Sequence, residues 1–462
     1  MVINIGFCYC FRIKKSYIRM NINIFLFEFK HFIRNKAKVF SYIIFVIICI
    51  LSIYNGLKTS DKQFETISDV KKNESLEHKK VYDWIDNISS NEDSLKTFSR
   101  SRKRVNSQEP FWAIIYTPNY VVKEPSPMFP FGIGQSQQFG FYKKINRWSS
   151  TYDTDTYEEI SNYERLINGD IDFSFMIIYL LPLLMIILTF NINGLEKDLN
   201  FHKLIAAQNK KVNLWIFNRL LFYVALLLIS VDVIIFLTGF FTGALESDLN
   251  NIFNLILLSN TYILFFSILF YFAIKNSQSI RSIAFKMISV WILFCVIIPG
   301  AVHQYVSYKY PVNYMTDFLD VNRKDTYDIF KLDSAELHSR LIELFPGTEI
   351  NDKHVNNDLI RRCMSAIAND MNMKAAYMVE NQNKSKNELI NSTYFFNPIS
   401  YVQNTWNQIT LTDYNSYKKY RDQIQTSIDI RNSLLVLESS KYAKDSVGVN
   451  IDTYNSYLEL LK

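Results

Sequence analysis

Residues able to carry chemistry are thinly spread along this sequence. No two of its six histidines stand at metal-ligand spacing. Two of its five cysteines lie inside apolar runs, which fits neither a zinc site nor a disulfide framework. The chain lacks a GxxxxGK[ST] phosphate-binding loop, an HExxH motif and a GxSxG motif. We therefore expect no catalytic residue, no metal, no cofactor and no enzymatic activity. The residues concerned are His31, His78, His202, His303, His338 and His354, with Cys8, Cys10, Cys49, Cys295 and Cys363.

One acidic residue, Asp232, lies near the middle of an apolar run, "LLISVDVIIFL". An ionisable group at such a depth is costly and usually faces a bundle interior or an aqueous cavity. It could belong to a substrate or ion path, or it could form a hydrogen bond between helices. We favour the hydrogen bond.

A charged segment, "NGLEKDLNFHKLIAAQNKK", directly follows an apolar run and keeps apolar residues of its own. At helical spacing, Leu195, Leu199 and Ala206 share one stripe. A second side carries Phe201, Leu204 and Ile205, and the charges of Glu196, Lys197 and Asp198 lie between the two. This pattern suits a helix held by its own bundle on one side and by a partner on the other. The alternative is a helix that only lies at the membrane interface.

Five apolar segments are long enough to cross a bilayer, which needs about 20 residues per helix. Runs such as "LFYVALLLISVDVIIFLTGFF" are rare in soluble cores, so we expect an all-α polytopic membrane protein. The predicted spans are 39–57, 172–192, 214–241, 252–274 and 283–302.

The distribution of lysine and arginine predicts the orientation. The segment before the first span is strongly basic, and the second-to-third and fourth-to-fifth connections are also basic, whereas the third-to-fourth loop holds only acids. We therefore expect a cytoplasmic amino terminus. Residues 1–38 are expected to act as an uncleaved signal anchor that contains a helix lying in the interface, with Met20 as the true start.

The two long segments, 58–171 and 303–462, would then lie outside as two domains. The first combines a charged helical stretch, Asp61 to Arg104, with a Pro- and Gly-rich part that predicts short strands and turns. It is therefore expected to be α+β. The second reads as mainly helical, with a capping box at Asp333 and Glu336 and two long helices over 356–389 and 413–444 that favour an antiparallel hairpin.

Four stretches together resemble the permeases of ATP-binding-cassette (ABC) type-2 exporters, in the subgroup with two large outer insertions. "EFKHFIRNKAKVF" resembles the elbow helix of that family. "NGDIDFSFMIIYLLPLLMIILTFNINGLEKD" resembles the block that ends the second span. "VWILFCVIIPGAVHQYVSYKYP" resembles the fifth span, and "NPISYVQNTWNQITLTDYNSYKKYRDQI" resembles the end of the second outer domain.

The resemblance implies that residues 193–213 form a coupling segment that docks on a separate ABC ATPase subunit. The family pattern Glu-Arg-Glu-x-Gly-Thr-Leu corresponds to Glu196 through His202, so the charges are kept in kind while Asn200, Phe201 and His202 replace Gly, Thr and Leu. It also implies a second permease chain and a sixth span. No sixth apolar run follows, so the chain is truncated, the gene model is incomplete, or the protein works with five spans; we favour truncation.

We therefore expect a multi-pass permease subunit in a bacterial inner membrane, in contact with lipid and not with nucleic acid. The coupling residues would be Glu196, Lys197, Asp198, Phe201, Leu204 and Ile205, with Asp232 as an intramembrane polar residue. The alternative is a membrane-anchored sensor or envelope-assembly protein that binds partners through its outer domains.

Overall fold

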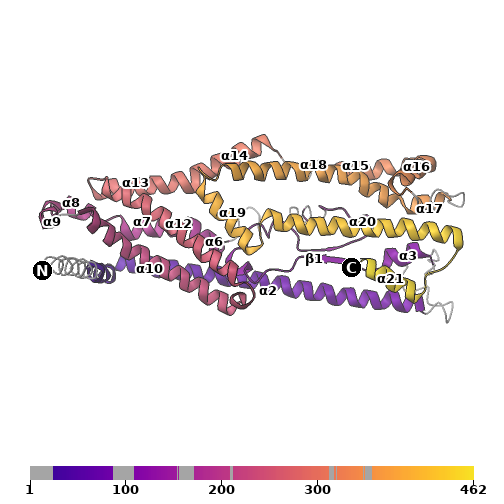
Figure 1. Cartoon of the computed structure of the whole chain (residues 1–462), viewed down its shortest axis with the longest axis horizontal. Helices are drawn as coiled ribbons and strands as arrows, with labels where there is room; N and C mark the ends of the chain where they lie inside the picture. Colours follow the sequence, from indigo (N-terminus) through magenta and orange to yellow (C-terminus); the bar gives the residue numbers. More distant parts are fainter. Residues whose placement is uncertain are drawn as a thin grey trace, which may run out of the picture.

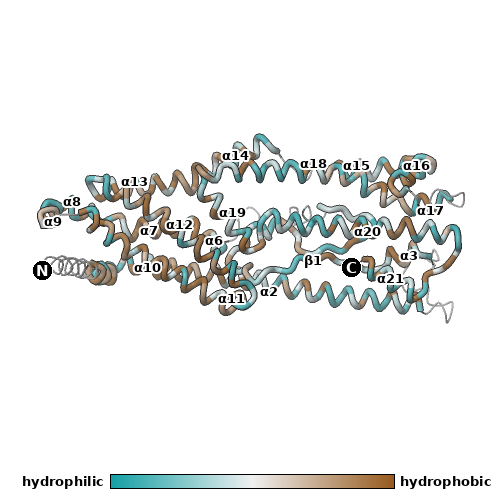
Figure 2. Tube along the Cα trace, in the orientation of Figure 1, coloured by the Kyte–Doolittle hydropathy of each residue, from teal (hydrophilic) through white to brown (hydrophobic). Residues whose placement is uncertain are grey.

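The molecule is long, with apolar helices at one end and polar helices at the other (Figures 1 and 2). We call the apolar end, residues 24–57 and 172–302, the bundle. We call the remainder the projecting part; it comprises residues 58–86 of α2, residues 109–152, and the described residues from 303 onward. The computed structural model describes residues 24–86, 109–152, 155, 171–208, 212–311, 317–318, 320–346, 348 and 356–461.

Among the described residues, five helices are long and apolar enough to cross a membrane. Four of them contain a predicted span whole, and the other begins at Phe173, one residue after the predicted start. The expectation of a mostly helical polytopic protein is confirmed at this level. The spans are built from α2 (Lys36–Asp86), from α6 (Phe173–Phe175), η4 (Met176–Leu180), α7 (Leu181–Thr189) and α8 (Gly194–Asp198), from α10 (Val212–Phe241), from α12 (Leu249–Lys275), and from α13 (Ile280–Ile292), η5 (Leu293–Ile297) and α14 (Ile298–Lys309).

Helix α2 joins the two ends of the molecule without a break. Its apolar half continues directly into the charged stretch, which is helical as far as Asp86; residues 87–104 of the predicted helical stretch lie outside the described residues. At Gly56 the loop around Pro130 approaches so closely that a Cβ atom would lie 2.5 Å from the Pro130 carbonyl oxygen. Glycine is therefore required there by the close approach of two backbones.

The two segments that the sequence suggested as separate domains share one hydrophobic core. Val81 and Trp84 of α2 pack in the same cluster as Ile367 and Leu435 from the second segment. The long helices α18 and α20 form the expected antiparallel pair (Figure 1). The expected cap at Asp333 is also present, because its side chain accepts a hydrogen bond from Glu336 N at 2.7 Å. The elements are α3 (Pro110–Tyr116), β1 (Tyr120–Val122), η3 (Phe129–Phe131), β2 (Tyr142–Lys144), α15 (Asp320–Ile329), α16 (Ser334–Leu344), α17 (Asn357–Arg362), α18 (Met364–Ser392), α19 (Pro398–Thr410), α20 (Tyr414–Asp445) and α21 (Ile451–Leu461).

The connection "FFNPISYVQNTW" is itself a helix, α19, which crosses between the two ends of the molecule (Figure 1). Asn397 caps it by accepting from Ser400 N, and Pro398 occupies the first turn, where its missing N–H is harmless. The apolar face of α19, including Trp406, packs into the core of the bundle. The strands β1 and β2 pair antiparallel, with Val121 opposite Lys143.

Two prolines interrupt the spans without ending them. Pro182 and Pro299 each follow a π-helical turn, Met176–Leu180 and Leu293–Ile297, which accommodates the clash of a proline ring with the preceding turn. Before Pro182, side chains of neighbouring spans bond to the carbonyls of this turn: Tyr262 donates to Ile178 O, and Trp291 Nε1 donates to Tyr179 O at 3.0 Å. The chain remains helical on both sides of each proline, and α14 continues past Pro299 to Lys309.

Candidate coupling site at the end of the bundle

A buried cluster of charges lies at the end of the bundle where the described chain begins. Arg219 of α10 forms ion pairs with Glu28, which belongs to the helix of residues 24–34, and with Glu196 of α8. Glu28 is 0% exposed and Arg219 is 3% exposed. We call Glu28, Arg219 and Glu196 the triad. It links three segments that are far apart in the sequence.

Lys38 completes the cluster from the first turn of α2. Its ammonium group donates to Asn191 Oδ1 at 2.9 Å, to Tyr223 Oη at 3.1 Å and to the carbonyl of Leu188. The Leu188 carbonyl lies in the last turn of α7, where carbonyls lack helical partners and attract cations. Tyr223 in turn donates to Glu28 Oε2 at 3.0 Å.

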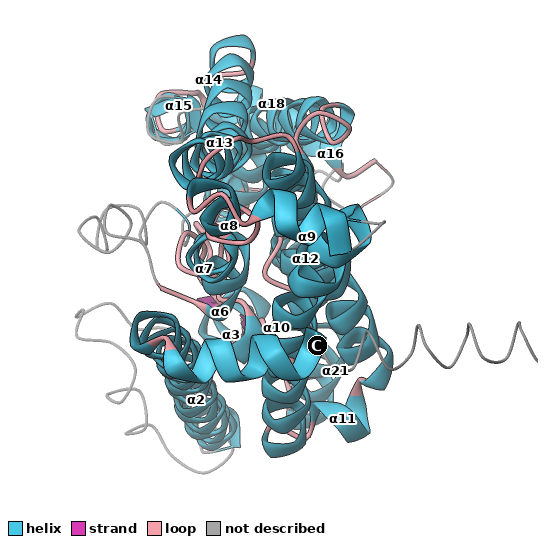
Figure 3. Ribbon diagram, turned by 90° about the vertical axis from the view of Figure 1, so that its left-hand side faces the viewer, coloured by secondary structure: helices cyan, strands magenta, loops and turns pink. Residues whose placement is uncertain are grey.

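The cluster balances two acidic against two basic side chains. A buried charge is tolerated only when it is paired and hydrogen-bonded, because removal from water otherwise costs several kcal/mol. Arg219 also stacks over the Trp215 ring, with its guanidinium carbon 4.7 Å from the ring centroid. The arrangement therefore fixes the helix of residues 24–34 across the end of the bundle, as the end-on view shows (Figure 3).

The coupling segment predicted from the sequence consists of two short helices, α8 and α9 (His202–Gln208), at this same end (Figure 3). Asn193 and Asn200 have φ of 62° and 61°, in the left-handed region that asparagine tolerates better than most residues. The first enters α8 and the second forms the turn toward α9. Together they fold the segment back on itself.

Three of the predicted coupling residues hold this segment on the bundle. Glu196 belongs to the triad, Lys197 Nζ donates to the carbonyl of Ser277, and Asp198 Oδ2 accepts from Ile280 N at 3.2 Å. A Cβ atom on Gly194 would lie 2.9 Å from side-chain atoms of Ile280, so this part of the segment packs tightly against α13.

The apolar residues of the segment point the other way. Leu195, Leu199, Phe201 and Leu204 are 39% to 57% exposed, and Ile205 is half-buried. We call these four exposed residues the docking patch. The expectation of one helix with an apolar side on the bundle is therefore wrong. The turn at Asn200 divides the segment into α8 and α9, the exposed apolar residues come from both expected sides, and the charges make the contacts with the bundle.

Sequence reasoning missed Glu28, Lys38, Arg219 and Tyr223 as members of this site. A signal was present, because an arginine only seven residues into α10 must find a partner when the helix is buried. Glu28 is also the only acid in the basic segment before the first span. Their pairing across nearly 200 positions of sequence could not be read from either signal alone.

Asp232 lies on α10 and accepts a hydrogen bond at 3.3 Å from Asn260 Nδ2 of α12. This is the interhelical bond favoured from the sequence. The remaining oxygens, Asp232 Oδ1 and Asn260 Oδ1, have no partner among the described residues.

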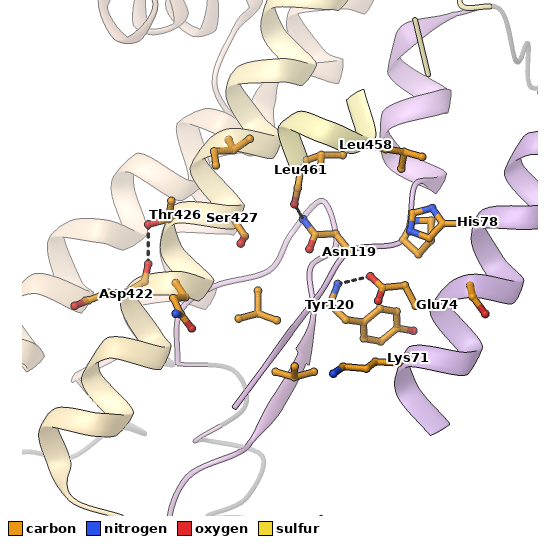
Figure 4. A pocket seen from close by; sticks show the side chains of 16 residues that line it. Lys71, Glu74, His78, Asn119, Tyr120, Asp422, Thr426, Ser427, Leu458 and Leu461 are labelled. Atoms are coloured by element: carbon orange, nitrogen blue, oxygen red, sulfur yellow. Dashed lines mark hydrogen bonds between the residues drawn. The ribbon is translucent and has the colours of Figure 1, made fainter. Parts of the chain in front are cut away.

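A cavity of about 700 Å³ opens in the projecting part, between α2 and α20 (Figure 4). Lys71, Glu74 and His78 face Asp422, Thr426 and Ser427 across it, and Leu458 and Leu461 of α21 lie at one end. We call this cavity the trough. Among the described residues no cluster of His, Cys, Asp and Glu could hold a metal ion.

No family model, curated protein or solved structure matches this chain.

Proposed function

We propose that this chain is the membrane-spanning subunit of an ABC exporter that is driven by a separate ATPase subunit. The observation that carries the proposal is the docking patch, an apolar surface on two short helices that are held on the bundle by charges. An exposed apolar patch on a rigid mount at the end of a bundle is typical of a surface that another protein covers.

Asn200 differs from the residue in the ABC type-2 family pattern, but its backbone conformation supports the resemblance. That position is glycine in the family pattern, and Asn200 has a φ of 61°. Glycine and asparagine are the residues that adopt this region most readily. The substitution therefore preserves the turn that separates the two helices of the segment.

The contacts of the segment supply a route for mechanical coupling. Glu196 reaches α10 and, through Arg219, the helix of residues 24–34; Lys197 and Asp198 reach the turn between α12 and α13. A partner that moves the docking patch would therefore move several spans together. Packed elements of this kind shift as rigid bodies rather than deform.

A second permease chain fits the uneven burial of the spans. The second candidate span is mostly buried, whereas the fifth buries only Ile283 and Met287 of α13 and Cys295 of η5 among its apolar side chains before Pro299. Its other apolar side chains would face lipid or a second copy. A bacterial inner-membrane location with a cytoplasmic amino terminus belongs to the same proposal and rests on the distribution of basic residues.

The test of docking is co-purification of a P-loop ATPase with the tagged full chain from its native membranes. Phe201→Asp and Leu204→Asp should each reduce the recovered ATPase at least tenfold. Lys203→Asp is the matched control, since Lys203 is already polar and exposed on the same helix. Equal recovery with all three variants, or no ATPase with the wild type, would refute the proposal.

A separate variant distinguishes docking from coupling. Glu196→Gln leaves the docking patch intact but weakens the triad, so the ATPase should still co-purify while substrate-stimulated hydrolysis falls. If Glu196→Gln releases the ATPase as strongly as Phe201→Asp does, Glu196 is part of the docking surface instead.

The trough favours a second candidate, a membrane-anchored sensor or assembly protein. Its volume falls in the range of ligand-binding pockets, about 300–1,000 Å³, and its lining combines charged and apolar groups (Figure 4). Thr426→Trp places a large side chain in the trough. Recovery of an envelope component with the wild-type chain but not with Thr426→Trp, and with no ATPase recovered, would favour this alternative.

A further inference from the structure

A second cavity, of about 350 Å³, lies where α19 crosses the end of the bundle. Five of the residues that line it are amides: Gln135, Gln138, Gln403, Asn404 and Asn407. Each amide side chain both donates and accepts hydrogen bonds. We call this cavity the amide pocket.

Asp172, the one carboxylate among the described residues that line the amide pocket, is already satisfied. Its Oδ1 accepts from Ser174 Oγ and from Phe175 N, both at 2.8 Å. Its Oδ2 accepts from the backbone N–H groups of Ile133 and Gly134. Four donors from its own surroundings therefore occupy Asp172. Among the amides, Gln403 Oε1 accepts from Tyr179 Oη at 3.4 Å and Asn404 Nδ2 donates to Tyr394 Oη at 2.9 Å. The remaining amide donors and acceptors are the groups that can bind a ligand.

Asn407 leaves one acceptor unused. Its side chain is 5% exposed, and Oδ1 has no hydrogen-bond partner among the described residues. A Cβ atom on Gly134, another lining residue, would lie 2.9 Å from this oxygen, which places it at the wall of the pocket. A buried acceptor without a donor is costly, so a ligand that donates there gains the missing bond.

Aromatic rings flank the amides on the side of the spans. Phe175 is 39% exposed, and its ring lies 5.1 Å from that of Tyr179 at an angle of 34°. The turn between α18 and α19 carries Phe395 and Phe396, which are 88% and 68% exposed. Aromatic residues gather at membrane interfaces, so their position places the amide pocket near the bilayer surface.

We propose that the amide pocket binds the uncharged, hydroxyl-rich head group of an amphipathic glycoside. Sugar hydroxyls donate and accept as the amides do, and the apolar face of a sugar ring packs on flat aromatic surfaces. An alkyl tail would leave the pocket along the apolar spans. Binding at this site does not depend on an ATPase partner, so the inference stands or falls separately from the proposed function.

The test uses the purified full chain in lipid nanodiscs and saturation-transfer difference NMR. Octyl glucoside, below its micelle concentration, is the probe. Methyl glucoside has the same head without the tail, and octyl sulfate has the same tail with an anionic head. The same measurement on nanodiscs that carry a pocket variant gives the signal from probe molecules dissolved in the lipid, and this signal is subtracted. We expect saturation of the sugar protons of octyl glucoside and much weaker signals for the other two compounds.

Gln403→Leu and Asn407→Leu should each weaken octyl glucoside binding about tenfold, which is the effect of one lost hydrogen bond to a buried group. Gln408→Leu is the matched control, because Gln408 is exposed on the same helix outside the pocket. Gln403 is half-buried, so its variant remains informative if Asn407→Leu does not fold.

Three results would overturn the inference. Equal binding of octyl sulfate would mean that only the tail is recognised. Equal binding of methyl glucoside would show that the alkyl tail contributes nothing to recognition. Unchanged binding of octyl glucoside by Gln403→Leu and by Asn407→Leu would show that the glycoside does not bind in the amide pocket.

Discussion

Two of the buried arginines, Arg219 in the bundle and Arg431 in the projecting part, are stabilised in opposite ways. Arg219 in the bundle is neutralised by the carboxylates of Glu28 and Glu196. Arg431 in the projecting part is also 3% exposed, but it donates to four backbone carbonyls: those of Ile114, Ile115, Thr117 and Ile145, at 2.6–2.9 Å.

The difference shows what each region is built to do. Arg431 carries its charge among neutral dipoles, and burial lowers its pKa to about 10. Its partners are backbone atoms, and they tie α20 to α3 and to the chain that follows β2. The partners of Arg219 are side chains on separate segments, so its pairing can be rearranged when one segment moves. We interpret Arg431 as a static clamp and the triad as a movable link.

The largest effect is expected from Arg219→Met. This change leaves the fully buried Glu28 and the part-buried Glu196 with Lys38 as the one remaining base of the cluster, and it should lower the free energy of unfolding by about 3–5 kcal/mol. Adding Glu196→Gln restores the balance of one acid, Glu28, against one base, Lys38, and should recover most of the loss. Thermal denaturation in detergent, followed by tryptophan fluorescence, measures both. A double variant no more stable than Arg219→Met would contradict the movable-link interpretation.

Arg431→Met should cost about 3 kcal/mol, because four carbonyls lose a buried donor at once. Limited proteolysis of the projecting part reports the loosening directly. No side-chain neutralisation can rescue this variant, since its partners belong to the backbone, whereas Arg431→Lys should recover part of the stability. Complete rescue by Lys would show that the charge matters and the fork geometry does not.

Gly56→Ala tests the joint between the two regions. The added methyl group would meet the Pro130 carbonyl oxygen at 2.5 Å, and overpacking of this kind costs about 2 kcal/mol. Gly300→Ala is the control, because nothing lies within 4 Å of the position that its Cβ atom would take and its backbone is helical. Equal melting temperatures for the two variants would show that the segment around Pro130 can move away from α2 at little cost in stability.

The smallest effect concerns Lys123 in the loop after β1, which donates to Leu411 O at 2.9 Å and lies over the Tyr417 ring. Burial lowers the pKa of Lys123 to about 8. The folded state therefore releases this proton before the unfolded state does, and stability should rise as the pH increases from about 8 toward the ordinary lysine value. Lys123→Met should lack this rise in denaturation curves between pH 7 and 10; an identical rise in the variant would assign it to another group.

Local sequence patterns predicted much of the fold. The five apolar segments, the Asp333 capping box and the helices on either side of α19 all follow from runs, caps and helical periodicity. The predicted coupling residues do lie together at one end of the bundle. Their division into inward charges and an outward patch was not predictable, because Glu196 faces inward only when Arg219 is there to receive it.

Long-range contacts account for the rest. The sequence suggested two domains, 58–171 and 303–462, because predicted spans separate these segments along the chain, yet Trp84 and Leu435 share one core. The helical character of α19 was hidden by the proline and aromatic residues at its start. The amide pocket has no signature, since its amides come from two segments separated by more than 260 positions.

The amino-acid sequence alone is enough to predict the apolar segments that form the five candidate membrane-crossing helices among the described residues, the long polar helices beyond them, and a charged segment with apolar sides after the second span. Those properties depend on hydrophobicity, helix caps and periodicity, which act over a few turns of chain. The pairing of the buried charges depends on the three-dimensional fold. Glu28, Lys38, Glu196 and Arg219 form one buried, neutral cluster because a charge removed from water must find its partner in three dimensions, wherever that partner lies in the sequence.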